Sequence, residues 1–539
     1  MQKLLLLGDE AIAQGALDAG LSGIYAYPGT PSTEITEYVQ HSKQAQAGGI
    51  HSTWSTNEKT AMEAALGMSY AGKRSMVCMK HVGLNVAADP FVNSAITGAN
   101  GGMIVVSADD PSMHSSQNEQ DSRFFGKFAM MPVLEPANQQ EAYDMVFYGF
   151  EFSEKYKTPV LMRITTRLAH SRAGVVRRDP AKQNELRMPS DLRQFVLLPA
   201  IARKRYRKLL DIQSVFEQES DASAFNHYYE GADKSRGIIV SGIGYNYLLE
   251  NYPDRNVPYP VLKIGQYPLP RKMMEKICAE CKEILVVEDG YPMIEEVLKG
   301  YLAKGITVRG RLDGSIPRDG ELNPNILALA LGMKDTYGLP VPGIVVGRPP
   351  SLCAGCPHID TYKALNEALQ DLPKGRVFSD IGCYTLGALK PYEAINSCVD
   401  MGASITMAKG AADAGMTPVV AVIGDSTFTH SGMTGLLDAV NDNAPVTVLI
   451  LDNATTAMTG GQDSPAFGKI EEICKGVGVN PDHIRILKPL KKYHEENVRI
   501  MLEELAYPGV SVIIPRRECI VAIDKRMRDK FKSKTPANS

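Results

Sequence analysis

The sequence predicts an α/β protein built from several doubly wound parallel-sheet domains. Apolar strand-like runs alternate with helix-like stretches, an alternation typical of parallel sheets covered by helices on both faces. In the last third of the chain the runs at residues 419–423, 446–451 and 510–514 are continuously apolar, as buried parallel strands are. The 539 residues leave room for three or four domains, at about 150 residues each.

Each element has its place in a domain plan. The first α/β unit contains strand-like runs at 23–27, 75–79, 102–106 and 159–164, with helix-like stretches at 57–70 and 140–156. A stretch rich in Arg, Lys, Gln and Glu predicts a helical connector, and a Pro/Gly-rich segment from 338 to 350 predicts a linker. The resulting plan is an α/β domain at 1–175, a helical connector at 176–235, an α/β domain at 236–340, an α/β domain at 350–525 and a basic tail at 526–539.

Composition and charge exclude several classes of protein. The chain is 44% hydrophobic and 22% charged, as globular proteins are, and its formal net charge of −3 gives no field favouring nucleic acid or membrane surfaces. No apolar run reaches the roughly 18 residues of a membrane span. The apolar residues 4–7 precede two acids, which predicts a buried first strand or helix turn rather than a signal peptide. We therefore expect a cytoplasmic protein with no nucleic-acid or membrane partner.

The strongest motif joins the ends of two buried strands. Gly424, Asp425 and Ser426 follow one strand, and Asn453 follows the next, 28 residues after Asp425. That gap fits a strand–helix–strand crossover, which places both side chains at the carboxyl ends of parallel strands. Mg²⁺ on a diphosphate prefers few, hard oxygen ligands. Asp425, Asn453 and the main-chain carbonyl of Thr455 could supply them.

Other readings of the same residues remain open. A Gly-Asp-Ser turn can be an ordinary crossover loop in which the aspartate caps the helix. In the ligand-binding reading, Gly424 lets a phosphate approach the backbone, and the following main-chain N–H groups cradle it. The second motif half and its preceding apolar strand favour the ligand-binding reading.

The pair of motifs resembles the thiamine-diphosphate enzymes, whose pattern is Gly-Asp-x followed, about 25 to 30 residues later, by an Asn-containing strand end. The usual Asn-Asn is Asp452-Asn453 here, and the second position carries the metal ligand in the family. The resemblance implies thiamine diphosphate held through Mg²⁺.

Further strings along nearly the whole chain resemble the large subunit of the indolepyruvate:ferredoxin oxidoreductases, a branch of the 2-oxoacid:ferredoxin oxidoreductase family. They occur in the family's order at residues 27–32, 56–59, 114–119, 353–358, 380–383 and 452–460. The resemblance implies two thiamine-diphosphate-binding-type domains plus a transketolase C-terminal-like domain. It also implies Asp380 and Gly382 as cofactor-binding residues.

In this family a carboxylate beside the aminopyrimidine ring activates the cofactor, and it lies at the start of a helix in the first domain. Glu58 occupies that place. Its competitor is Glu63, and without the resemblance Glu58 reads as a first-turn acid favoured by the helix dipole.

Two further catalytic candidates lie in the first domain. Thr30 lies in a turn that resembles the family's oxoacid-contacting loop, and its hydroxyl is expected to donate to the substrate. His81 is a candidate donor or acid near the oxoacid, although a lone histidine is more often structural.

Four cysteines match the family's cluster ligands. Cys353 and Cys356 form a Cys-x-x-Cys, Cys383 follows Ile-Gly, and Cys519 follows the last strand. The resemblance implies that they bind a [4Fe–4S] cluster. Zinc at the same thiolates and no metal at all remain alternatives. A second Cys-x-x-Cys, Cys278 and Cys281, reads as structural.

The activity implied by the resemblance is oxidative decarboxylation of an aryl 2-oxoacid, with coenzyme A taking the acyl group and ferredoxin the electrons. Because Glu58 and Asp425 fall in different domains, we expect a homodimer of this chain within an α2β2 assembly containing a smaller β subunit. Resembling subunits usually carry a ferredoxin-like tail with further clusters, whereas the 20 residues after Cys519 hold no cysteine. We therefore expect a separate acceptor.

Two rival functions remain open at this stage. One is a non-oxidative thiamine-dependent decarboxylase, which needs no cluster. The other is a thiamine-binding scaffold that only stabilises a partner subunit.

Overall fold

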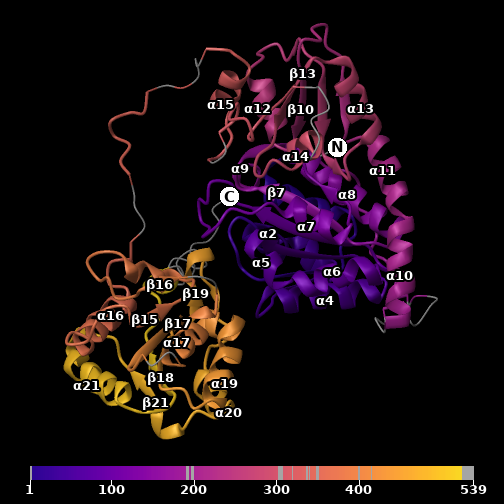
Figure 1. Cartoon of the computed structure of the whole chain (residues 1–539). Helices are drawn as coiled ribbons and strands as arrows, with labels where there is room; N and C mark the ends of the chain where they lie inside the picture. Colours follow the sequence, from indigo (N-terminus) through magenta and orange to yellow (C-terminus); the bar gives the residue numbers. More distant parts are fainter. Residues whose placement is uncertain are drawn as a thin grey trace, which may run out of the picture. The chain divides into compact units, whose positions relative to one another are not determined.

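The computed structural model forms two compact units, Met1–Pro340 (unit 1) and Val341–Ser539 (unit 2), shown in Figure 1. The structure describes residues 3–187, 189, 194–195, 199–300, 307–317, 320–334, 338, 340–347, 351–398, 401–413 and 416–524. The basic tail at 526–539 and the linker residues 348–350 lie outside this range. Within the described residues the fold is α/β with several parallel sheets, as the sequence predicts.

Unit 1 contains a seven-stranded sheet, a five-stranded sheet and a two-stranded ribbon. Its strands are β1 (Lys3–Leu7), β2 (Gly23–Ala26), β3 (His51–Trp54), β4 (Ser75–Lys80), β5 (Met103–Asp109), β6 (Val133–Leu134), β7 (Val160–Thr165), β8 (Arg172–Val176), β9 (His227–Tyr229), β10 (Gly237–Ser241), β11 (Val261–Ile264), β12 (Gln266–Tyr267), β13 (Glu283–Val287) and β14 (Thr307–Arg309). Its helices are α1 (Gly8–Asp18), α2 (Thr33–His41), α3 (Lys43–Ala47), α4 (Glu58–Tyr70), α5 (His81–Val86), α6 (Ala88–Thr97), α7 (Ser122–Ala129), α8 (Gln139–Tyr156), α9 (Thr166–His170), α10 (Pro199–Asp211), α11 (Gln213–Asp221), α12 (Gly244–Glu250), α13 (Arg271–Glu280), α14 (Met293–Lys299) and α15 (Pro324–Ala330).

The seven-stranded sheet has the order β12-β6-β7-β5-β4-β2-β3 and is parallel except for β12. Successive residues of β4 point to opposite faces, as strand geometry requires. Met76 and Cys78 pack with α1, α2 and α8, whereas Val77 and Met79 pack with α4, α5 and α6. The sheet is therefore covered on both sides, and its parallel strands end at one common edge.

The five-stranded sheet has the order β14-β13-β10-β11-β9. Only β9 runs antiparallel to its neighbour. The chain that builds this sheet also supplies β12 to the seven-stranded sheet, where β12 pairs with β6. Helices α10 and α11, from the stretch expected to be a connector, run along one side of unit 1 (Figure 1).

The start of the chain differs from the prediction in its burial. Residues 3–7 do form a strand, β1, which pairs antiparallel with β8. The two-stranded ribbon leaves most of β1 uncovered, since Leu6 is buried but Leu5 is 67% exposed.

Unit 2 is built on a six-stranded, fully parallel sheet with the order β16-β15-β17-β18-β22-β21. Its strands are β15 (Val377–Ser379), β16 (Ser397–Cys398), β17 (Val419–Gly424), β18 (Val446–Leu451), β19 (Thr455–Thr456), β20 (Gln462–Asp463), β21 (Ile484–Leu487) and β22 (Ser511–Pro515). Its α-helices are α16 (Pro357–Ala368), α17 (Ala403–Asp413), α18 (Asp425–Thr427), α19 (Met433–Asn441), α20 (Ile470–Gly476) and α21 (His494–Leu505). A π-helical turn, η2 (Phe428–Gly432), joins α18 to α19, and short 3₁₀ turns are η1 (Cys383–Ala388), η3 (Ala457–Thr459), η4 (Pro481–His483) and η5 (Lys491–Tyr493).

The central strands of unit 2 are buried on both faces. In β17, Ala421 and Ile423 pack with α17, α19 and α20, whereas Val420 and Val422 pack with α16 and α21. This two-sided burial explains why the strands read as continuous apolar runs in the sequence.

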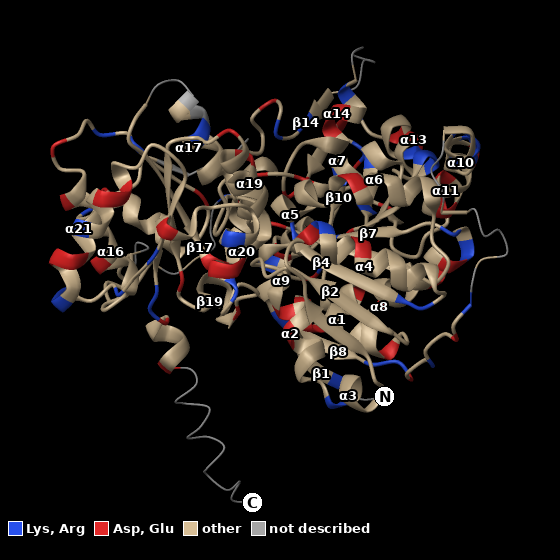
Figure 2. Ribbon diagram, turned by 90° about the horizontal axis from the view of Figure 1, so that it is seen from below, with Lys and Arg blue, Asp and Glu red and all other residues tan. Residues whose placement is uncertain are grey.

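Charges are mixed over both units. Figure 2 shows basic and acidic residues interspersed along the helices rather than separated by sign. In the described part of the chain, every helix is too short or too polar to cross a lipid bilayer.

Candidate functional site

Unit 2 brings the two halves of the Gly-Asp-Ser and Asn motif together. β17 and β18 are parallel neighbours, and Gly424 at the end of one lies opposite Leu451 at the end of the other. Asp425 and Asn453 therefore follow strands that end at the same edge of the sheet. Both side chains are buried.

Asp425 is a buried carboxylate, and one of its oxygens has no hydrogen-bond partner among the described residues. Its Oδ1 accepts a hydrogen bond from the N–H of Ser426 (2.8 Å). Its Oδ2 is buried and accepts none among the described residues. Burial raises the pKa of Asp425 to about 7. A cation bound at Oδ2 would supply the missing partner and favour the charged carboxylate.

The loop after β18 folds back over this position. Oδ1 of Asn453 accepts from the N–H of Thr455 (3.2 Å), and the Thr456 hydroxyl donates to the Ser426 hydroxyl (3.0 Å). The short β19–β20 hairpin holds Thr455 in place. The loop after β18 thus meets the loop after β17, and the predicted ligands are oxygen donors of the kind that Mg²⁺ requires.

Asp452, which stands where the thiamine-diphosphate family usually has the first Asn of Asn-Asn, has a structural role. Its Oδ2 accepts from Nε of Arg516 (2.6 Å), and Arg516 also pairs with Glu471 (2.6 Å). Asp452 thus joins β18 to the segment after β22. The predicted metal ligand is its neighbour, Asn453.

Asp380 differs from Asp425 although burial raises the pKa of each to about 7. Oδ2 of Asp380 accepts from the Ser404 hydroxyl (2.6 Å), and Oδ1 accepts from the Tyr384 hydroxyl. Both oxygens are therefore engaged by the protein itself, and Asp380 holds η1 in position.

Gly424 and Gly382 make room for an aromatic ring. A Cβ built on Gly424 would lie 2.5 Å from Cε1 of Tyr384, and one on Gly382 would lie 2.1 Å from the same atom. Gly424 thus accommodates the Tyr384 ring, and the phosphate approach expected from the sequence stays a prediction.

The four matched cysteines lie around this edge of the sheet. Burial, together with the neighbouring Cys356, Cys519, Asp425 and Cys353, raises the pKa of the Cys383 thiol to about 12. Burial likewise raises the pKa of Cys356 to about 11. Such thiols become ligands only when a positive centre stabilises the thiolate.

Main-chain and imidazole contacts tie the cysteines to the Asp425 site. The N–H of Cys519 donates to the main-chain oxygen of Asn453 (3.1 Å). Nε2 of His358, two residues after Cys356, lies 3.5 Å from Sγ of Cys383 and 3.4 Å from Nδ2 of Asn453. Burial lowers the pKa of His358 to about 4. A neutral imidazole therefore separates Cys383 from Asn453.

In unit 1 the structure separates Glu58 from its competitor. Glu58 begins α4 and is buried, whereas Glu63 is 46% exposed and pairs with Lys59. The Glu58 carboxylate lies against α5, because a Cβ on Gly83 would lie 2.5 Å from its Oε1. Of the two carboxylates, only Glu58 lies in a protected environment.

His81 and Thr30 lie at the carboxyl edge of the same sheet. Nε2 of His81 lies 3.2 Å from the main-chain oxygen of Asn118, to which it can donate, and its buried Nδ1 has no partner in the described part of unit 1. The main-chain oxygen of Thr30 accepts from the Ser115 hydroxyl (3.3 Å). Glu58, His81 and Thr30 thus follow β3, β4 and β2 at the common edge.

Three residues of these sites are not among the predicted site residues, although His358 lies in the resembling string at 353–358. Lys80 is buried beside His81, its Nζ donates to the main-chain oxygen of Ser115 (2.6 Å), and burial lowers its pKa to about 8. His358 and Tyr384 are the other two. For Lys80 and Tyr384, proximity to motif residues is the only hint that the sequence offers.

Glu58 belongs to unit 1 and Asp425 to unit 2. Each unit therefore supplies one set of candidate cofactor contacts.

Two family models match the chain. Residues 14–203 match "Pyruvate flavodoxin/ferredoxin oxidoreductase, thiamine diP-bdg". Residues 380–500 match "Thiamine pyrophosphate enzyme, C-terminal TPP binding domain". The first range contains Thr30, Glu58 and His81, and the second contains Asp425 and Asn453.

Curated relatives extend the similarity over nearly the whole chain. The indolepyruvate oxidoreductase subunit IorA of Archaeoglobus fulgidus is 39% identical over 559 aligned positions, covering 98% of this chain and 88% of the relative. The subunit of the same name from Pyrococcus abyssi is 39% identical, covering 96% of this chain and 86% of the relative.

Among solved structures, a chain of the 2-oxoglutarate:ferredoxin oxidoreductase from Magnetococcus marinus superposes with a TM-score of 0.51 and 18% identity. The match covers 61% of this chain and 65% of that chain. At this identity the likeness shows the shared fold alone.

Proposed function

The chain belongs to the family of indolepyruvate oxidoreductase subunits IorA, and from that membership we propose that it oxidatively decarboxylates an aryl 2-oxoacid of the indolepyruvate type. It is a thiamine-diphosphate-dependent 2-oxoacid oxidoreductase subunit. The observation that carries the assignment is 39% identity over 98% of the chain. The identity of the side chain on the oxoacid is part of the proposal.

We assign Mg²⁺ to Asp425, Asn453 and the main-chain carbonyl of Thr455. The partnerless buried Oδ2 of Asp425 supports this assignment, because a buried carboxylate without a partner costs free energy that a cation offsets. Ser426 lies beside these ligands, and its hydroxyl is oriented by Thr456. Asp380 and Gly382 contribute indirectly, through η1 and Tyr384.

Thiamine diphosphate, when bound, supplies the carbanion chemistry that decarboxylation requires. The residues of this chain bind the cofactor and handle protons. Glu58 would share a proton with the aminopyrimidine, because its carboxylate is held away from solvent at the start of α4. The Thr30 hydroxyl would donate to the oxoacid. His81 would act beside it as a hydrogen-bond donor or acid, and its buried Nδ1 has no partner among the described residues that would compete.

We further propose a [4Fe–4S] cluster at Cys353, Cys356, Cys383 and Cys519. Ligand atoms around a tetrahedral zinc stand roughly 3.8 Å apart for sulfur. No three of the four thiols, all within the described residues, approach within 4.8 Å of one another. This spacing is wider than a preformed zinc site requires, and four thiolates are the ligand number of a [4Fe–4S] cluster.

The partners of this proposal follow from its chemistry. Electrons pass to ferredoxin, coenzyme A accepts the acyl group, and a smaller β subunit completes the enzyme in an α2β2 assembly. A cytoplasmic location belongs to the same proposal, and the free thiols of every cysteine whose side chain the structure describes support it.

One preparation tests the proposal. The complex is purified anaerobically, and iron, sulfide and thiamine are quantified before turnover is measured with a panel of 2-oxoacids, coenzyme A and a low-potential acceptor. We expect four irons per chain at this site, bound thiamine diphosphate, and preference for aryl pyruvates. An iron-free enzyme that makes aldehyde would contradict the oxidative assignment and support a non-oxidative decarboxylase.

A single substitution tests the assignment of Mg²⁺ to Asp425. We expect Asp425→Asn to abolish Mg²⁺-dependent thiamine diphosphate binding, measured by calorimetry, because the amide cannot balance the cation. The control is Asp452→Asn, whose side chain pairs with Arg516 instead. Retained cofactor affinity in Asp425→Asn would refute the assignment.

A further inference from the structure

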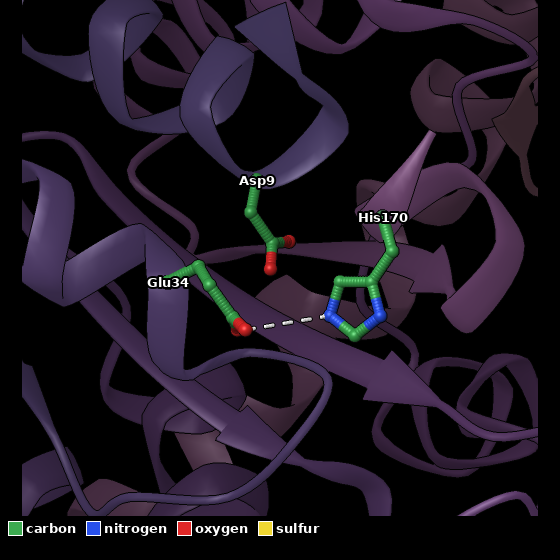
Figure 3. A group of neighbouring side chains, drawn as sticks. All are labelled: Asp9, Glu34 and His170. Atoms are coloured by element: carbon green, nitrogen blue, oxygen red, sulfur yellow. Dashed lines mark ion pairs between the residues drawn. The ribbon is translucent and has the colours of Figure 1, made fainter. Parts of the chain in front are cut away.

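A second cluster of ligand-type side chains lies in unit 1, among residues to which neither the sequence motifs nor the proposed mechanism give a role. Asp9 lies in the first turn of α1, Glu34 in the first turn of α2, and His170 at the end of α9. One ligand atom from each lies within 4.8 Å of the others, and the three side chains point toward one another (Figure 3). Residues 9, 34 and 170 are far apart in sequence, so the fold alone brings them together.

Asp9 is the anomalous member of this group. It is 0% exposed, and neither of its carboxylate oxygens has a hydrogen-bond partner among the described residues. Burial, with Glu34 and Glu10 nearby, raises the pKa of Asp9 well above its usual value. A fully buried carboxyl with two idle oxygens is costly, and native structures rarely keep one without a ligand or partner.

Neither Glu34 nor His170 donates a hydrogen bond to the Asp9 carboxylate. Nε2 of His170 lies 3.6 Å from Oε1 of Glu34, the ion pair drawn in Figure 3. The second oxygen of Glu34 is buried and, within the described residues, also has no hydrogen-bond partner. Three buried carboxylate oxygens, two of Asp9 and one of Glu34, therefore have no hydrogen-bond donor among the described residues.

Two carboxylates and one imidazole form a donor set that suits first-row divalent cations. Oxygen and nitrogen ligands around a tetrahedral zinc stand roughly 3.4 Å apart, since each bond is about 2.1 Å. The 3.6 Å separation between Glu34 and His170 already fits this spacing. The ligand atoms of the three residues lie up to 4.8 Å apart. Side-chain shifts of roughly 1 Å would bring them to the spacing of zinc ligands.

Access and charge also fit a cation. The side chains of Glu34 and His170 are 37% and 36% exposed, whereas Asp9 is fully buried and lies on the side of the cluster away from solvent. A cation can therefore enter from solvent, keep water in its open positions and balance the two carboxylates.

We propose that Asp9, Glu34 and His170 form a divalent-cation site of the zinc or manganese class. The ion joins α1, α2 and α9. Because Glu34 lies four residues after Thr30, the ion also fixes the start of α2 directly behind the turn expected to contact the oxoacid.

The test measures metal binding rather than turnover. The full chain, prepared with Asp425→Asn to remove the expected Mg²⁺ site, is stripped with chelator without thiamine diphosphate. It is then titrated with Mn²⁺, the free ion being followed by electron paramagnetic resonance, and in parallel dialysed against Zn²⁺ with metal analysis. We expect one ion per chain at this site and a rise in melting temperature on metal addition.

Adding Asp9→Asn is expected to weaken binding at least tenfold, since even removing a residue that only supports a metal ligand usually costs about ten- to a hundredfold. It should also remove the metal-induced rise in melting temperature. The matched control is Glu10→Gln, next in the chain, whose carboxylate accepts from the N–H of Leu7 (2.8 Å) and lies outside the proposed ligand set.

Two results would overturn the proposal: no ion bound by the Asp425→Asn chain, or equal binding with and without Asp9→Asn. His170→Ala serves as a second variant at the solvent side, should Asp9→Asn fail to fold. Equal metal binding by that variant would likewise overturn the site.

Discussion

At the scale of single residues, buried carboxylates of this protein fall into two groups that only their partners distinguish. Asp380 is satisfied on both oxygens by Ser404 and Tyr384, so it holds structure. Asp425 and Asp9 each keep at least one idle oxygen, so each has capacity for a ligand. The sequence cannot separate these groups, because it shows an aspartate after a strand or at a helix start in every case.

Glu58 gives the first prediction at this scale. We expect Glu58→Gln to lower turnover by about 10²- to 10⁴-fold, the usual contribution of a positioned acid–base group, while thiamine diphosphate stays bound. Turnover with an aryl pyruvate and a low-potential acceptor, together with the thiamine content, measures this.

The control for Glu58 is Glu63→Gln, because Glu63 is exposed and paired with Lys59. Its turnover should match the unsubstituted enzyme. Full activity of the Glu58 variant would instead support a scaffold role for this chain.

Asp289 gives a prediction about pH. It is 1% exposed, its Oδ2 has no hydrogen-bond partner in the part of the chain that the structure describes, and burial raises its pKa to about 6. A raised carboxyl pKa destabilises the fold where the unfolded chain is ionised. The penalty is full above pH 6 and disappears as the pH falls toward 4.

We therefore expect Asp289→Asn to stabilise the protein by roughly 2–3 kcal/mol near pH 7.5 but by only about 1 kcal/mol near pH 4.5, from 1.36 kcal/mol per pKa unit. Denaturant unfolding of the cofactor-free chain at both pH values measures this. Hydrogen bonds from Ser315 and Gly310 lower the pKa of the exposed Asp313, so Asp313→Asn should change stability in the opposite direction. A pH-independent gain for Asp289→Asn would show that its charge is not the cause.

The sequence predicts some residues of the candidate sites but not others. Glu58, Asp425 and Asn453 are readable because each lies at a strand end or helix start, where local pattern fixes position. The packing of Tyr384 against Gly424, and the placing of His358 beside Cys383, depend on side chains that meet only after folding. The cluster of Asp9, Glu34 and His170 has no motif at all.

At the scale of elements, a buried ion network joins the two large sheets of unit 1. Arg123 in α7 donates to Glu288 after β13 (2.9 Å) and to the main-chain oxygen of Tyr291 (2.9 Å). Arg163 in β7 donates to Asp109 at the end of β5 (2.5 Å) and to the main-chain oxygen of Asp289 (2.6 Å). Both guanidinium groups are fully buried, so their carboxylates depend on them for charge balance.

We expect Arg123→Met to destabilise unit 1 by roughly 3–5 kcal/mol, because removing one partner leaves buried carboxylates uncompensated. The first unfolding transition in denaturant measures the loss. The control is Arg271→Met, since Arg271 pairs with Glu275 on the surface at 72% and 66% exposure and should leave the midpoint unchanged. Equal, small effects of the two substitutions would mean that the network contributes little.

The sequence predicts most elements because their patterns are local. The helix expected at 57–70 is α4, and the strands expected at 446–451 and 419–423 are β18 and β17. The pairing of β12 with β6 was not predictable, because a two-residue strand has no periodicity to read.

At the scale of the whole molecule, the candidate cofactor contacts are divided between unit 1 and unit 2. If one chain pairs its Glu58 with Asp425 of a second copy, chains carrying Glu58→Gln and chains carrying Asp425→Asn should complement each other. A mixed dimer would contain one site free of both substitutions, so we expect about half of the wild-type turnover per mixed dimer.

Each variant alone should be inactive, and co-purification with two affinity tags isolates the mixed species. Activity that stays at the background of the single variants would show that one chain builds its own site. Sedimentation of an active monomer would contradict the homodimer directly.

The strand order of unit 2 also bears on how the protein is made. β22, the last strand among the described residues, is an interior strand that lies between β18 and β21. The ribosome must therefore release residues 511–515 before this sheet can close, whereas the strands of unit 1 emerge much earlier. Unit 1 is expected to fold during synthesis, as N-terminal domains do. Insertion of the proposed cluster at Cys519 would therefore be a late step of biogenesis, after translation has passed β22.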